Sequence, residues 1–131
     1  MNAFLIELEN KPGSLARVGE VLAARNINIT SMAGVTCGGS GRLIMTTDNP
    51  RATSEALGGA GIGFDDRELT VASMPNVPGT LAVAARRLAD AGINVEALLP
   101  LGMQGNDIMA GVVTDQPART RELLAQAGAT T

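Results

Sequence analysis

The sequence predicts an α+β fold of two βαββαβ modules in tandem. One stretch of the 131-residue chain occurs twice, and each time it lies between a predicted strand and a predicted helix. Residues 10–16 read Asn-Lys-Pro-Gly-Ser-Leu-Ala, and residues 76–82 read Asn-Val-Pro-Gly-Thr-Leu-Ala. The register continues downstream, where it aligns Leu22 with Leu88, Ile27 with Ile93, and Asn28 with Asn94. We therefore expect one module at residues 1–67 and a second at residues 68–131. A unit of this size buries little surface alone, so the modules should associate further, and a homodimer is expected.

The first module should begin with a strand that a turn connects to an amphipathic helix. Its predicted elements are strand 3–8, a helix after Gly13, strand 27–32, a hairpin tip at 37–41, strand 42–47, a helix from 50 to about 58, and a short strand at 62–64. Leu15, Val18 and Leu22 recur at three- and four-residue steps, which places them on one apolar helix face. Asn49 is the expected N-cap of the second helix and Pro50 its first residue.

The second module repeats this order, which is that of a ferredoxin-like fold with an antiparallel sheet and both helices on one face. Its predicted elements are strand 69–73, helix 80–91, strand 93–99, a hairpin at 102–105, strand 108–114 and a helix from Pro117. Leu81, Ala85 and Leu88 repeat the apolar helix face. Few residues follow Gly128, so we expect either a very short closing strand or an unpaired sheet edge that is open to another strand.

Composition excludes several classes of function. The net charge is −3 and Phe4 and Phe64 are the only aromatic residues, which disfavours binding of nucleic acid by stacking on a basic groove. Without histidine, and with scattered carboxylates, the chain offers no metal site and no Ser/His or Cys/His nucleophile, so we expect neither an enzyme nor a cofactor. The single Cys37, the lack of a leader and the lack of a long apolar stretch indicate a cytoplasmic protein that does not enter a membrane.

The repeated turn is the best candidate for function. Pro12 presets one backbone angle, Gly13 permits unusual dihedral angles, and the N–H groups at the helix start have no partner within the helix. Such a helix start favours an anion. Asn10 and Asn28 would add neutral amides within reach, and the set suits the carboxylate and ammonium groups of an α-amino acid. The alternative is a purely structural turn in which the hydroxyl of Ser14 or Thr80 caps the helix.

The motifs Glu9–Leu15 with Asn26–Ile29, and Pro75–Leu81 with Gly92–Val95, resemble the ACT domain, here as a tandem pair. The serine-sensing regulatory domain of D-3-phosphoglycerate dehydrogenase, a member of that family, is similar in its Asn-x-Pro-Gly-x-Leu turn and in the Asn before its second strand. The resemblance implies modules that pair into larger sheets and bind amino acids between them. The candidate ligand-binding residues lie in the two turns and the following strands: Asn10, Pro12, Gly13, Ser14, Leu15, Asn28, Ile29, Thr30 and Met32, and then Asn76, Pro78, Gly79, Thr80, Leu81, Asn94, Val95, Glu96 and Leu98.

The sequence thus indicates a non-enzymatic regulatory protein that holds an amino acid at module or subunit interfaces. Lys11 aligns with Val77 and Thr30 with Glu96, so the two sites are expected to differ, either in ligand or in whether they bind at all. The alternative function is an interaction subunit that pairs with a separate amino-acid biosynthetic enzyme and has no ligand of its own. The identity of the amino acid does not follow from the sequence.

Overall fold

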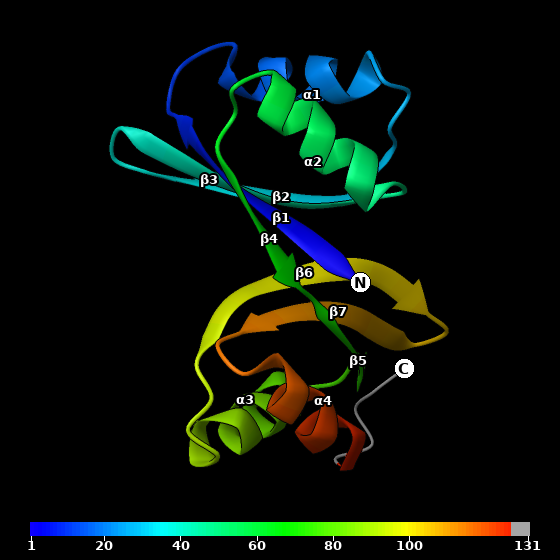
Figure 1. The fold of residues 1–131 in the computed structure, drawn as a ribbon. Helices are drawn as coiled ribbons and strands as arrows, with labels where there is room; N and C mark the ends of the chain where they lie inside the picture. The colour runs from blue at the N-terminus through cyan, green and yellow to red at the C-terminus, as the bar shows by residue number, and fades with distance from the viewer. Residues whose placement is uncertain (127–131) are drawn as a thin grey trace. The chain divides into compact units, whose positions relative to one another are not determined.

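A computed structural model describes residues 1–126 of the chain, whose contacts form two compact units (Figure 1). The first unit comprises Asn2–Arg67, and the second comprises Met1 together with the chain from Glu68 onward. The described residues form seven strands and four helices, in a βαββαβ order that starts again in the second unit. The predicted fold class, two ferredoxin-like modules in tandem, is confirmed. None of the described helices has the length and apolar character needed to cross a membrane.

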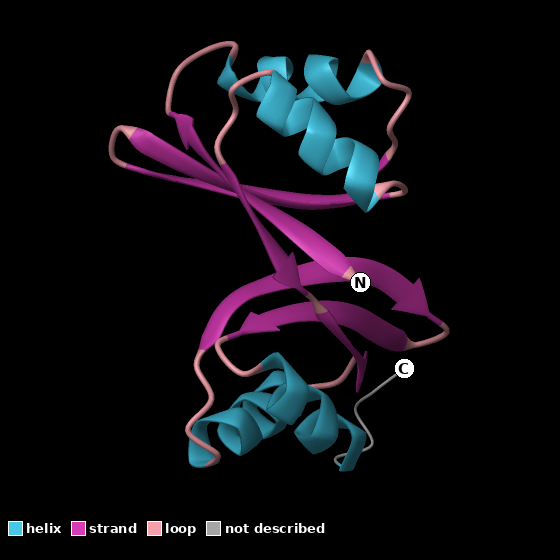
Figure 2. Ribbon diagram, viewed as in Figure 1, coloured by secondary structure: helices cyan, strands magenta, loops and turns pink. Residues whose placement is uncertain are grey.

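The first unit is a four-stranded sheet with two helices on one of its faces (Figure 2). Its elements are β1 (Asn2–Glu9), α1 (Ser14–Ala23), β2 (Ile29–Cys37), β3 (Ser40–Thr47), α2 (Pro50–Gly59) and β4 (Phe64–Glu68). The strand order is β2-β3-β1-β4, and β3 runs antiparallel to both β1 and β2. Phe4, Ile6, Leu22, Met45 and Leu57 are fully buried between sheet and helices. β2 is therefore an outer strand of this sheet.

The second unit has the same layout in its described part. Its elements are β5 (Thr70–Pro75), α3 (Thr80–Asp90), β6 (Val95–Gln104), β7 (Asp107–Thr114) and α4 (Pro117–Gln126). The strand order is β5-β7-β6, with both pairings antiparallel, so β6 takes the outer position that β2 has in the first unit. The short closing strand considered after Gly128 lies outside the described residues. Up to residue 126, no strand of this unit pairs with β5 on the side away from β7.

Three predicted strands begin later than expected, because their first residues belong to helix caps. The N–H of Ile27 donates to the carbonyl of Leu22 (3.1 Å), that of Ile62 to Leu57 (3.0 Å) and that of Ile93 to Leu88 (2.9 Å). The residues just before them, Asn26, Gly61 and Gly92, have φ of 56°, 72° and 73°. This is the Schellman arrangement, in which a left-handed residue ends the helix and the next apolar residue packs back onto it. β2, β4 and β6 therefore begin only at Ile29, Phe64 and Val95.

The expected apolar faces of α1 and α3 are only partly buried. Val18 and Leu22 are 1% and 0% exposed, as predicted, whereas Leu15 is 59% exposed and Leu81 is 55% exposed. Leu15 lies two turns before Leu22, at the end of the helix where the chain enters from β1. At that end it lines a surface hollow and does not enter the core. The shared apolar face is therefore buried at Val18, Leu22 and Leu88, whereas Leu15 and Leu81 remain exposed.

Candidate functional site

The two repeated turns place a glycine in the left-handed region directly before a helix. Gly13 has φ 90° and ψ −16° at the N-cap of α1, and Gly79 has φ 91° and ψ −11° at the N-cap of α3. Neither helix start receives a hydrogen bond from a capping side chain. The Thr80 hydroxyl donates instead to the carbonyls of Pro75 (2.9 Å) and Val77 (3.1 Å). The N–H of Ser14 donates to the carbonyl of Lys11 at 3.4 Å. The next N–H groups of α1 and the first N–H groups of α3 have no capping side chain and lie at the positive end of the helix dipole.

Each turn is anchored to the hairpin tip of its own sheet. The backbone N–H of Asn10 donates to the carbonyl of Gly39 and its carboxamide N–H donates to Gly38, both at 3.0 Å. In the second unit the N–H of Asn76 donates to the carbonyl of Asn106 at 3.1 Å. Asn10 therefore has a structural role, which leaves its carboxamide oxygen and second amide hydrogen for a ligand. The carboxamide of Asn76 makes no hydrogen bond within the described chain.

Asn28 and Asn94 are held by their backbone and not by their side chains. The N–H of Asn28 donates to Oδ1 of Asp48 at 3.0 Å, and its carbonyl accepts from the N–H of Asp48 at 3.0 Å. Asp115 holds Asn94 in the same way, at 3.0 and 3.3 Å. Both asparagine side chains are exposed. Sequence reasoning had missed these two aspartates, although each stands in a repeated Asp-(Asn/Gln)-Pro segment that signals their shared role.

The structure separates two residues that were expected to meet. The Asn10 turn lies beside the tip that joins β2 to β3, whereas Asn28 directly precedes the first residue of β2. The whole of β2 lies between them, which at the usual rise per strand residue is roughly 30 Å. Asn10 and Asn28 of one unit therefore cannot touch the same small molecule, and the same reasoning applies to Asn76 and Asn94.

Two hollows flank the start of α1. One of about 550 Å³ is lined by Asn10, Ser14, Leu15 and Met32, among others. The other, of about 450 Å³, is lined by Pro12, Gly13, Ser14 and Arg17. Each of these hollows is large enough to hold a free amino acid.

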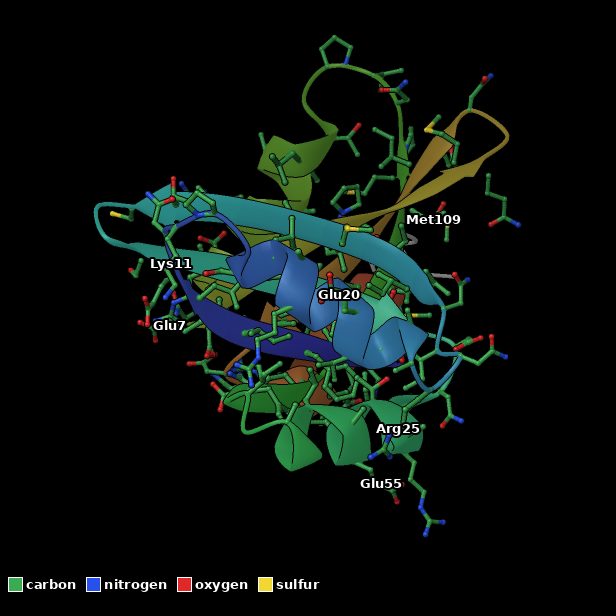
Figure 3. All side chains as sticks on the ribbon, turned by 90° about the horizontal axis from the view of Figure 1, so that it is seen from above. Glu7, Lys11, Glu20, Arg25, Glu55 and Met109 are labelled. Atoms are coloured by element: carbon green, nitrogen blue, oxygen red, sulfur yellow. The ribbon has the colours of Figure 1, made fainter. Side chains whose placement is uncertain are left out.

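Charged side chains surround these hollows. Lys11 contacts Glu9 (Nζ–Oε2 3.0 Å) and Arg42 contacts Glu7 (3.7 Å). Figure 3 shows Glu7 and Lys11 at the end of the first unit where the turn lies.

The remaining predicted residues differ in their exposure and in the contacts of their side chains. In the second unit, Leu81, Val95 and Leu98 line a smaller hollow of about 180 Å³. Ile29 is half-buried against the first core. The Thr30 hydroxyl is hydrogen-bonded to that of Thr46 at 2.7 Å. Pro78 and Glu96 are exposed. Among the described residues, no group of three or more Cys, Asp and Glu side chains could hold a metal ion.

Fold and turn geometry together define a pair of ferredoxin-like modules whose first helices begin at uncapped glycines. Residues 3–56 match the family model of the ACT domain. The first unit is therefore similar to the ACT domain over most of its length, and the assignment of both modules to that family remains a prediction. No curated protein sequence shows significant similarity to the chain.

Solved structures show the same fold over nearly the whole chain. Protein BT0572 from Bacteroides thetaiotaomicron is 26% identical, with a TM-score of 0.84 over 98% of this chain and 89% of that one. The regulatory subunit of aspartate kinase from Thermus thermophilus, in its ligand-free form, is 22% identical with a TM-score of 0.59. The corresponding subunit from Thermus flavus is 20% identical with a TM-score of 0.65. Each of these two alignments covers 96% of this chain and 90% of the other.

Proposed function

We propose that the protein is a non-enzymatic regulator that binds a free amino acid at the glycine-begun helix starts, at interfaces between modules or subunits. The observation that carries the proposal is the absence of a side-chain cap on both α1 and α3, at Gly13 and Gly79. The unpaired N–H groups there suit a carboxylate, because donors and helix dipole act together. Carboxamides nearby suit the ammonium group.

Strand pairing between two copies would complete such a site. β2 is an outer strand, with the Asn10 turn beside its last residue and Asn28 before its first. If two β2 strands pair antiparallel, the beginning of one lies next to the end of the other. The exposed carboxamide of Asn28 from one copy then approaches the turn of the second copy. This arrangement explains why two residues that lie about one strand length apart within a unit could serve one ligand, and it predicts a homodimer.

A second candidate function is a regulatory subunit that pairs with a separate enzyme without a ligand of its own. It is favoured by the similarity in size and fold to regulatory subunits of aspartate kinase. Both candidates describe a regulator without catalytic activity. They differ in whether an amino acid binds to the isolated protein.

A thermal-shift screen against the free amino acids separates these two functions. The chain has no Trp or Tyr, so calorimetry or an extrinsic dye must report the unfolding. A ligand at one hundred times its dissociation constant should stabilise the protein by about 2.7 kcal/mol. No shift with any amino acid would contradict amino-acid binding and leave the second candidate.

Two asparagine variants then locate the site. Asn28→Ala should weaken binding and leave unfolding of the free protein unchanged, because this carboxamide makes no hydrogen bond within the described chain. Asn49→Ala is the matched control: Asn49 caps α2, accepting the N–H of Ala52 at 3.1 Å, so its loss should lower stability and not affinity. Equal affinity of Asn28→Ala and the unmodified protein would reject this site.

A further inference from the structure

The second unit contains an apolar hollow beneath α3 that reaches into its core. The hollow has a volume of about 180 Å³ and is lined from α3, α4 and all three strands of the unit, by residues that include Ala72, Ala84, Leu88, Leu98 and Val112. Every described residue that lines it is alanine, valine, leucine or methionine. The described structure has no buried side-chain polar atom without a hydrogen-bond partner. Water would find nothing to bind in such a space, which therefore suits a hydrocarbon group.

The hollow arises from smaller core residues on the sheet. Phe4 pairs with Met45 across β1 and β3 in the first unit, and Thr70 pairs with Val112 at the same place in the second. One step further along the same face, Ile6 of the first unit corresponds to Ala72 of the second. At each of these positions the second unit has the smaller side chain.

The helix above the sheet shows the same difference. Val18 is 1% exposed in α1 and fills the space over the sheet. The equivalent residue of α3, counted from the glycine N-cap, is Ala84, which is only half-buried. α3 buries Leu88 alone, whereas α1 buries both Val18 and Leu22. The second unit thus lacks core volume on both sides of the hollow.

The mouth of the hollow lies close to the proposed binding turn. Leu81, Leu98 and Val95 line the hollow and are 55%, 45% and 41% exposed, so the space is open to solvent past them. Leu81 is the second residue of α3 and follows Gly79 by less than one helical turn. A molecule whose carboxylate lies at the start of α3 could therefore extend a side chain into the hollow.

We infer that the second unit has its own binding site, which is selective for amino acids with an aliphatic side chain and receives that side chain in the hollow beneath α3. This inference rests on the proposed amino-acid binding and adds to it the ligand class. An apolar space of about 150 Å³ accommodates a group as large as benzene, so the side chain of leucine or isoleucine fits. We do not assign this selectivity to the first unit, because charged residues surround its turn.

The test compares L-leucine with L-asparagine, whose side chain has the same number of non-hydrogen atoms but is polar. Isothermal calorimetry measures both on the full chain and on variants that fill the hollow. Ala84→Val adds from the helix the residue type that the first unit has, and Ala72→Ile does so from the sheet. Ala89→Val is the control, because it makes the same change as the first variant at an exposed position of α3.

The unmodified protein and Ala89→Val should bind leucine and discriminate against asparagine, and both filled variants should lose at least about tenfold in leucine affinity. Denaturation curves of the free proteins show whether each variant is folded, and two independent fillings keep the test valid if one variant is not.

Leucine binding that is unchanged in the filled variants would overturn the inference. Binding of polar amino acids but not of leucine would overturn it and leave the proposed function standing. If no amino acid binds, both fail. If filling the hollow instead dissociates an oligomer, the hollow holds a side chain of a second copy, which also overturns the inference.

Discussion

Gly13→Ala and Gly19→Ala make the same chemical change six residues apart, and the structure predicts effects of opposite sign. A Cβ at either position would have no atom within 4 Å, so neither variant introduces a clash. Gly13, however, has φ +90° at the N-cap of α1. An L-residue held in this region costs about 1–2 kcal/mol, so Gly13→Ala should lower the free energy of unfolding by that amount. For a unit of this size the melting temperature should fall by roughly 4–16 °C.

Gly19→Ala provides the control within the same helix. Gly19 lies inside α1 with ordinary helical angles, so alanine there should raise stability by about 0.5–1 kcal/mol through a smaller loss of backbone entropy on folding. Both free energies can be measured by urea denaturation followed by far-UV circular dichroism. If Gly13→Ala were as stable as the unmodified protein, the left-handed N-cap would not be required by the turn. The N–H groups of the turn would then not be held outward by the left-handed glycine.

Two further predictions concern packing and capping. In Gly111→Ala the added Cβ would lie 2.6–2.8 Å from three side-chain atoms of Leu69, which is 3% exposed, so a loss of about 1–3 kcal/mol is expected from overpacking. Leu69→Ala removes those atoms, so denaturation of the double variant should show a smaller loss than the sum of the two single losses; additive losses would contradict the contact. Asn49→Ala should lower the free energy of unfolding by about 0.5–2 kcal/mol because α2 loses its cap. A change below a few tenths of a kcal/mol would show that this cap is dispensable.

Local signals in the sequence predicted most of the elements, since each depends on residues close together in the chain. Asn49 caps α2 and Pro50 begins it, as expected from the Asp-Asn-Pro segment. Gly13 and Gly79 both precede helices, as the repeated turn predicted. The errors at the starts of β2, β4 and β6 have one cause: an isoleucine after a helix reads as the beginning of a strand, although its N–H closes the preceding helix.

The candidate site was predicted less completely, because its composition depends on contacts between distant segments. That Asn10 anchors its turn to Gly38 depends on how the hairpin of β2 and β3 folds beside β1. The clamp of Asp48 on Asn28 also joins residues far apart in the sequence. Neither contact leaves a periodic pattern in the chain. What a single sequence does carry is the repetition of the Asp48 and Asn28 pair as Asp115 and Asn94.

The duplicated sequence was sufficient to establish two βαββαβ modules and two glycine-begun helices, because turns, caps and amphipathic patterns act over a few residues. Tertiary structure alone decided that Asn10 and Asn28 lie at opposite ends of β2, since strand register sets the distance between them. It also decided that the second unit has an apolar hollow beneath its first helix. Ala72, Ala84 and Val112 line this hollow and belong to three different elements. The space between these small side chains therefore forms only when the three elements pack together.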